Sequence, residues 1–95
     1  MVKLGVLDQV HVSEGRTAED ALQESTRLIQ AVESFGYLRF WVSEHHGMHS
    51  LAFSSPEVLI AHLAAATSRI RVGSGGIMLP HYSSYKVAEN FRLLE

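Results

Sequence analysis

The chain has 95 residues, of which 46% are hydrophobic and 19% charged, so it can build one modest core and one domain. A net charge of −2, with Lys and Arg scattered singly, makes nucleic acid a poor partner. Without cysteine, a signal-like leader or a long apolar run, the sequence excludes disulfides and thiolate chemistry and predicts a soluble, cytoplasmic protein with no membrane partner.

The first predicted unit is a buried strand over Leu4–Leu7 followed by a helix. The short apolar run ends at Asp8, which is typical of a parallel strand. Thr17 and Asp20 resemble a capping box, and apolar residues then recur at three- and four-residue spacing. Gly36 stands where a C-terminal cap belongs, so the helix is expected to end there.

The second predicted unit begins with a strand over Arg39–Val42, which is rich in strand-forming residues. Ser55 can cap a helix, and Pro56 suits its first turn. This helix is expected to run to about Thr67. The third unit has a strand over Ile70–Val72, a glycine-rich segment, and a helix that begins near residue 84 and continues to the last residue.

This order of elements predicts an α/β fold with parallel strands and right-handed crossovers. A (β/α)8 TIM barrel takes about 250 residues, or about 31 per unit, which matches the spacing of the units here. The chain is therefore interpreted as the first three βα units of an incomplete barrel, with residues 1–95 forming a single partial domain. An open three-stranded sheet is the alternative.

Candidate functional residues follow the predicted strands, because parallel α/β folds place their sites at the carboxyl ends of strands. These positions hold Asp8, the Glu44-His45-His46 cluster and the glycine-rich segment. A histidine near neutrality can exchange protons, so His45 or His46 could be catalytic, although a loop hydrogen bond explains them equally well. A metal site is less favoured, because Gly47 interrupts the i, i+4 spacing of His45 and His49.

The glycine-rich segment, Gly73, Ser74, Gly75 and Gly76, leaves the backbone bare at a strand end. Such backbone lets a flat ligand lie against the main chain, and a tight turn or bulge is the alternative. The segment is neither a dinucleotide fingerprint, a P-loop nor a hydrolase elbow. Elsewhere, His62 is expected to be a packing histidine with satisfied hydrogen bonds. Phe40 and Trp41 are expected to fill the barrel wall.

Three segments together resemble the bacterial luciferase-like flavin monooxygenase family. They cover nearly the whole chain in the family's order. The segments are Trp41-Val42-Ser43-Glu44-His45-His46, Ser55-Pro56-Glu57 with Ala61-His62-Leu63-Ala64-Ala65-Ala66-Thr67, and Arg71-Val72-Gly73-Ser74-Gly75-Gly76-Ile77-Met78-Leu79-Pro80.

The resemblance implies a (β/α)8 barrel about three times this length that uses reduced FMN, or less favourably a deazaflavin, with O2 to oxygenate an organic substrate. It implies that His45 assists proton transfer near the flavin, supported by His46 and Glu44, and that residues 73–76 contact the cofactor. Gly75-Gly76 matches the place where relatives carry a non-prolyl cis peptide. The flavin phosphate would be held by later strands, and a flavin reductase is a plausible partner.

The resemblance therefore predicts an N-terminal portion of a monooxygenase that binds FMN weakly and is inactive alone. The alternative is a non-enzymatic module that forms homo-oligomers, because three parallel strands leave two open edges and an uncovered apolar face. A metal-dependent hydrolase built on the histidines is a weaker third hypothesis.

Overall fold

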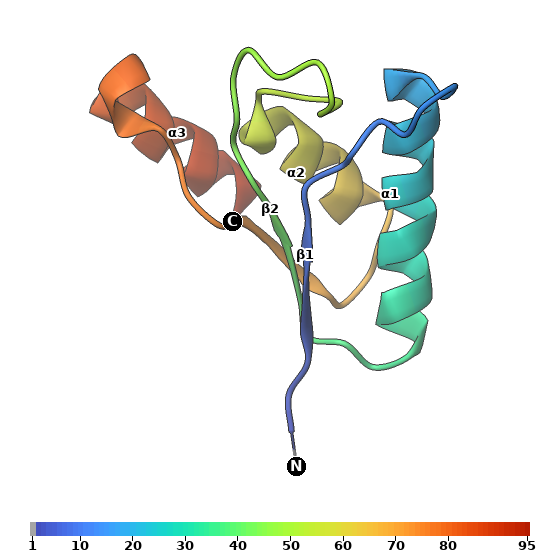
Figure 1. Cartoon of the computed structure of the whole chain (residues 1–95). Helices are drawn as coiled ribbons and strands as arrows, with labels where there is room; N and C mark the ends of the chain where they lie inside the picture. Colours follow the sequence, from blue (N-terminus) through green and yellow to red (C-terminus); the bar gives the residue numbers. More distant parts are fainter. Residues whose placement is uncertain (1) are drawn as a thin grey trace.

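The computed structural model describes residues 2–95, and these form a three-stranded parallel sheet in the order β1-β2-β3 (Figure 1). In the register of the sheet, Leu7 pairs with Trp41 and Trp41 pairs with Gly73. The alternation of strands and helices predicted from the sequence is confirmed. The elements are β1 (Gly5–Asp8), α1 (Ala18–Ser34), β2 (Arg39–Val42), α2 (Pro56–Ala65), β3 (Arg71–Ser74), the short 3-10 helix η1 (Leu79–His81) and α3 (Ser84–Leu94).

One face of the sheet is covered and the other is open. Phe40 and Val42 of β2 are fully buried in the core, together with Ile29 of α1 and Leu63 of α2. Alternate side chains of a strand point to opposite faces, so Trp41 lies on the other face, where it is 40% exposed. Phe40 thus packs under the helices, whereas Trp41 lies on the face that further strands of a closed barrel would cover.

The boundaries of α1 follow the predicted capping signals. The Thr17 hydroxyl accepts the Asp20 N–H at 3.1 Å, and the Asp20 carboxylate accepts the Thr17 N–H at 3.0 Å, so the capping box is confirmed. Gly36 has a φ of +88°, the left-handed conformation that glycine adopts without steric cost.

Helix α2 begins at Pro56 with Ser55 in the N-cap position, as predicted, but it lacks the expected capping hydrogen bond and ends before Thr67. Ser55 makes no capping hydrogen bond with its side chain, because its ψ of 83° differs from the extended conformation of a capping residue. The helix ends at Ala65, before Thr67, whose hydroxyl donates to the Leu63 carbonyl at 2.9 Å. Because the Thr67 side chain bonds to this backbone carbonyl, the helix ends earlier than its apolar pattern suggested.

Strand β3 is longer than expected and continues through Gly73 and Ser74. These residues pair with Trp41 and Val42, and the Gly75 N–H then donates to the Val42 carbonyl at 2.7 Å. Pairing with a neighbouring strand therefore outweighs the low strand propensity of glycine. Strand β1 is displaced by one residue from the predicted Leu4–Leu7.

Glu33, near the end of α1, binds the chain at the amino end of β3. One oxygen of its carboxylate accepts the backbone N–H groups of Ser68, Arg69 and Ile70 at 2.9, 2.6 and 2.9 Å. These residues lead directly into β3, so Glu33 joins α1 to the start of that strand. None of the helices within residues 2–95 has the length and apolar character needed to cross a membrane.

Candidate active site at the carboxyl edge of the sheet

Glu44 lies two residues beyond β2 and is only 7% exposed. Its Oε1 atom accepts the Met78 backbone N–H at 3.0 Å. Its Oε2 atom accepts the Tyr82 hydroxyl at 2.5 Å and lies 2.5 Å from His46 Nε2. The Glu44 carboxylate therefore joins the loop after β2 to the segment between β3 and α3. We call Glu44, His46, Tyr82 and the Met78 N–H the Glu44 network.

The hydrogen bonds of this network determine its charge. Burial raises the pKa of Glu44, but hydrogen bonds from Tyr82, His46 and the Met78 N–H outweigh it and hold that pKa below its usual value of 4.5. The same bond to Glu44 raises the pKa of Tyr82 to about 12. At neutral pH the network therefore contains a Glu44 carboxylate and a neutral Tyr82 phenol.

The two adjacent histidines occupy different surroundings. His46 joins the Glu44 network with 39% of its side chain exposed, and its ring lies edge-on to the His81 ring at a centroid distance of 5.4 Å. His45 instead lines a surface depression with loop residues that include Met48 and His49. The structure thus links His46, and not His45, to the buried carboxylate. Gly47, with a φ of +68°, turns the chain immediately after them.

The predicted cofactor-binding residues form the end of β3 and the turn that follows it. The Ser74 hydroxyl is hydrogen-bonded to the Gly76 carbonyl, and the Gly76 N–H points back to that hydroxyl at 3.3 Å. A Cβ atom added to Gly76 would meet no atom within 4 Å. A Cβ atom on Gly75 would lie 3.6 Å from the Val42 carbonyl oxygen and 4.0 Å from Leu7 Cδ1. The space beside the Gly76 backbone is therefore open.

The cis peptide that the resemblance suggested for Gly75-Gly76 is not present. Every peptide bond within residues 2–95 is trans. The Gly75 N–H, which belongs to the preceding peptide bond, extends the hydrogen-bonding ladder of the sheet to β2.

Asp8, at the end of β1, links the loop that follows the strand to helix α1. Its Oδ2 atom accepts the Ser25 hydroxyl of α1 at 2.6 Å, and its Oδ1 atom accepts the Val10 N–H at 2.8 Å. Val10 is buried with a φ of +55°, which is rare for a β-branched residue. Both oxygens of Asp8 are thus used to fix the chain where it leaves the sheet.

His62 differs from the packing histidine that was expected. It is exposed on α2, and its Nε2 atom lies 3.0 Å from the Thr26 hydroxyl of α1. It forms a hydrogen bond between the two helices at the surface. Residues 2–95 contain no group of three or more His, Cys, Asp or Glu side chains arranged to hold a metal ion.

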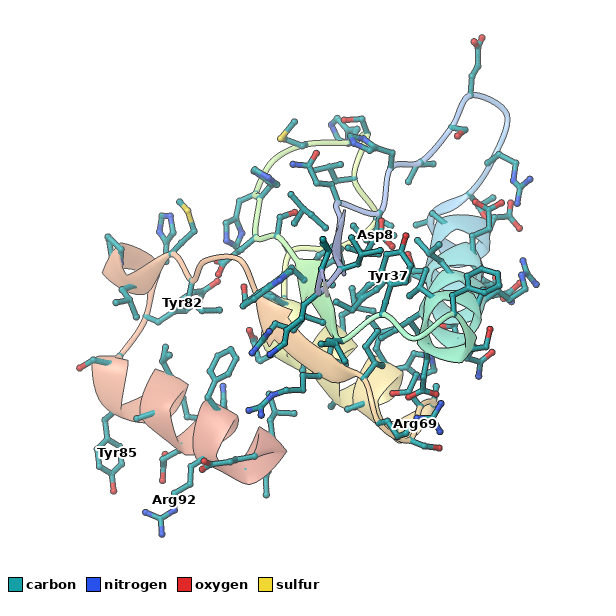
Figure 2. The ribbon with its side chains drawn as sticks, turned by 90° about the horizontal axis from the view of Figure 1, so that it is seen from below. Asp8, Tyr37, Arg69, Tyr82, Tyr85 and Arg92 are labelled. Carbon is teal, nitrogen blue, oxygen red and sulfur yellow. The ribbon has the colours of Figure 1, made fainter. Side chains whose placement is uncertain are left out.

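Tyr82 is the member of the site that the sequence did not indicate. It lies between η1 and α3, 38 positions from Glu44, and follows no strand directly. Figure 2 shows Tyr82 reaching toward the strands, whereas Tyr85 on α3 points away from them. Only the turn formed by η1 brings the Tyr82 hydroxyl to the carboxylate, and no motif in the sequence marks that turn.

Comparison with known sequences places this chain in a family. The family model for luciferase-like monooxygenases matches residues 2–95. The chain is 70% identical over its whole length to the YwcH protein of Bacillus subtilis strain 168. It is 56% identical, over 99% of its length, to the N-acetyl-S-alkylcysteine monooxygenase of the same organism. It spans 28% of the length of each of these relatives.

Solved structures agree with this assignment. The structure of apo-MsnO8 superposes with a TM-score of 0.95 at 52% identity, over 99% of this chain and 29% of that one. The oxygenating constituent of 3,6-diketocamphane monooxygenase from Pseudomonas putida, solved in complex with FMN, superposes with a TM-score of 0.87. At 24% identity, over 99% of this chain and 26% of that one, this second likeness shows the fold alone.

The three βα units are therefore part of a TIM barrel, as the unit spacing predicted, and they align with the N-terminal portion of longer proteins. By the match over residues 2–95 and the identity to its relatives, the chain belongs to the luciferase-like monooxygenase family.

Proposed function

We propose that this chain forms one wall of the active site of a monooxygenase that uses reduced FMN and O2 to oxygenate a small organic substrate. The observation that carries the proposal is the Glu44 network, in which a buried carboxylate holds His46 at the carboxyl edge of the sheet, the edge at which the open backbone of Gly76 also lies. Membership of the family and the FMN bound to the diketocamphane enzyme support the choice of cofactor.

The residues present fit a flavin. Its ring system is flat, and the backbone of Gly75 and Gly76 carries no side chain directly after the end of β3. Gly73, Ser74, Gly75 and Gly76 would hold the ring, since Gly76 has no atom within 4 Å of a Cβ position. Later strands would hold the phosphate, as they do in barrels generally, so the 95-residue chain alone is expected to bind FMN weakly and to be inactive.

The side chains of the Glu44 network would handle protons. Reduced FMN, when bound, supplies the two electrons with which O2 is activated. His46 would hold or release a proton beside it, because imidazole titrates near neutrality and its Nε2 atom is fixed by Glu44. His45, the residue that the resemblance favours, would act from the neighbouring depression. The proposal also includes a cytoplasmic location for the protein and a flavin reductase as the partner that supplies reduced FMN.

A hybrid enzyme tests the proposal. In it, this chain replaces the matching segment of the B. subtilis N-acetyl-S-alkylcysteine monooxygenase, which is 56% identical to it. With a flavin reductase and 18O2, the hybrid enzyme should place labelled oxygen in that relative's substrate. Label found only in hydrogen peroxide or water would not be evidence of oxygenation. A folded hybrid enzyme that binds FMN but forms no labelled product would contradict the proposal.

A second function, self-association of the 95-residue chain, is favoured by the exposure of Leu7 and Trp41 on the open face. A closed barrel would cover this face with further strands, but in the chain alone a second copy is the available cover. Sedimentation should show a homo-oligomer at tens of micromolar. A stable monomer, or an oligomer unchanged by Trp41→Ser, would contradict this expectation.

A further inference from the structure

Two donors share one oxygen of Glu44. The Tyr82 hydroxyl and His46 Nε2 both lie 2.5 Å from Oε2, while Oε1 is occupied by the Met78 N–H at 3.0 Å. Tyr82 Oη and His46 Nε2 are themselves 3.3 Å apart. Both carboxylate oxygens therefore accept hydrogen bonds, and three donors from two segments of the chain, the loop after β2 and the segment between β3 and α3, hold the carboxylate in place.

This arrangement determines which nitrogen of His46 carries the proton. An ionised carboxylate only accepts hydrogen bonds, so Nε2 at 2.5 Å must donate. Neutral His46 is then the tautomer protonated on Nε2, and Nδ1 holds the free lone pair. In the Ser-His-Asp triad a carboxylate likewise fixes the tautomer of an imidazole, although there it binds Nδ1–H and leaves Nε2 as the base.

We propose that Tyr82 is a positioning residue for proton transfer by His46: its hydroxyl fixes the Glu44 carboxylate, which in turn holds His46 with Nε2 protonated and Nδ1 as the proton acceptor. The inference rests on the proposed function and adds a residue and a reacting atom to it. The phenol keeps its proton and serves only to orient the carboxylate, because the bond to Glu44 raises the pKa of Tyr82 to about 12.

A purely structural role for Tyr82 is the competing explanation, since its bond also fastens η1 to the loop after β2. Tyr82 is 37% exposed, so removing its hydroxyl leaves the ring in place and creates no cavity. The other titratable groups near it are His81, whose ring centroid lies 6.2 Å away, and Glu57. Tyr82→Phe therefore removes the hydrogen bond with little other change.

Tyr85→Phe is the matched control, because it removes the same hydroxyl from a residue that is 75% exposed on α3. The first measurement is 15N NMR of histidine-labelled 95-residue chain, which reads the tautomer of His46 without any activity. Wild type and Tyr85→Phe should show the Nε2–H tautomer with a ring proton protected from exchange with water. In Tyr82→Phe that proton should exchange faster, and Glu44→Gln, whose amide can also donate, should mix the tautomers.

The second measurement is turnover by the hybrid enzyme. Tyr82→Phe should lower kcat about tenfold while KM changes less than about twofold, since a hydrogen bond to a charged group is worth about that factor and substrate binding is not involved. The acid limb of kcat should move to higher pH, because the hydroxyl lowers the pKa of Glu44. Tyr85→Phe should match wild type in both respects.

Two results would overturn the inference: a wild-type His46 protonated on Nδ1, or a Tyr82→Phe variant equal to Tyr85→Phe in exchange rate and in kcat. A wild-type hybrid enzyme without oxygenation would instead defeat the proposed function. The NMR measurement would still decide the role of Tyr82, so the two failures are distinguishable.

Discussion

Glu33 and Glu44, two carboxylates at opposite ends of the sheet, make the same number of hydrogen bonds but bind different kinds of donor. At the amino ends of the strands, Glu33 accepts three backbone N–H groups through one oxygen. At the carboxyl ends, Glu44 accepts one backbone N–H and two donors that are titratable side chains. Hydrogen bonds hold the pKa of both carboxyl groups below the usual value.

The difference lies in what each carboxylate holds. Backbone groups cannot change protonation near neutrality, so Glu33 can only fasten the chain before β3. Glu44 is more deeply buried and holds an imidazole and a phenol, whose orientation matters to any reaction at that edge. The comparison follows the general division of parallel barrels, in which the amino face serves stability and the carboxyl face serves chemistry.

The largest expected effect is on turnover at the carboxyl edge. In the hybrid enzyme, His46→Ala should lower kcat by about 100-fold or more while FMN affinity is retained, because a positioned acid or base contributes that much. His45→Ala should also lower turnover without loss of flavin binding. Steady-state kinetics and flavin titration measure both.

The matched control for these histidines is His62→Ala, which removes only a surface hydrogen bond to Thr26. It should leave kcat unchanged. Full activity in His46→Ala would remove that residue from the mechanism, and full activity in His45→Ala would do the same for its neighbour.

A smaller effect is expected at the amino edge. Glu33→Gln retains an acceptor oxygen but loses the charge that strengthens three hydrogen bonds, so the Tm should fall by a few degrees while kcat of the hybrid enzyme stays the same. Thermal unfolding followed by circular dichroism measures the first quantity. A fall in kcat as large as that of a Glu44 variant would contradict the claim that Glu33 serves stability alone.

Acid stability should depend on both carboxylates. Their pKa values are lowered on folding from 4.5, so their contribution is fully present above pH 4.5 and is lost as pH falls through the lowered values. Urea unfolding between pH 7 and pH 3 should therefore show a loss of stability that is shallower in the Glu33→Gln, Glu44→Gln double variant. Parallel curves for the two proteins would contradict the assignment of these pKa shifts.

The smallest effect is expected at alkaline pH. The pKa of Tyr82 rises on folding from 10.0 to about 12, so its contribution is present below pH 10.0 and is lost as pH rises through about 12. Tyr82→Phe should remove this part of the alkaline loss of stability, and Tyr85→Phe should not. Ultraviolet titration of the tyrosines should show one group with the raised pKa in wild type and none in Tyr82→Phe.

Much of the fold could be predicted because local signals agree with the tertiary structure. The β2 bounds Arg39–Val42 and the capping box at Thr17 were both confirmed. The end of β3 was predicted less well, because Gly73 and Ser74 join the strand through pairing with β2 and not through their own propensity. The opposite faces of Phe40 and Trp41 could not be assigned, because a single strand does not reveal which of its faces the helices cover.

The candidate site could be predicted only in part. The position of Glu44 and His46 could be predicted, because functional residues of parallel α/β folds lie at the carboxyl ends of the strands. The separation of His45 from His46 depends on the path of the loop after β2, and the contribution of Tyr82 depends on η1, a turn that no sequence signal marks. Hydrogen bonds between segments more than 30 positions apart, such as Tyr82 to Glu44, require the folded structure.

The most direct test of the account compares kcat of Glu44→Gln and Glu33→Gln in the hybrid enzyme, with both proteins measured at a temperature where each is fully folded. The account predicts that Glu44→Gln lowers kcat at least about tenfold, as expected for loss of a charged hydrogen-bond acceptor, while Glu33→Gln equals wild type. Equal kcat values for the two variants would contradict the claim that the carboxyl edge is the functional part of this chain.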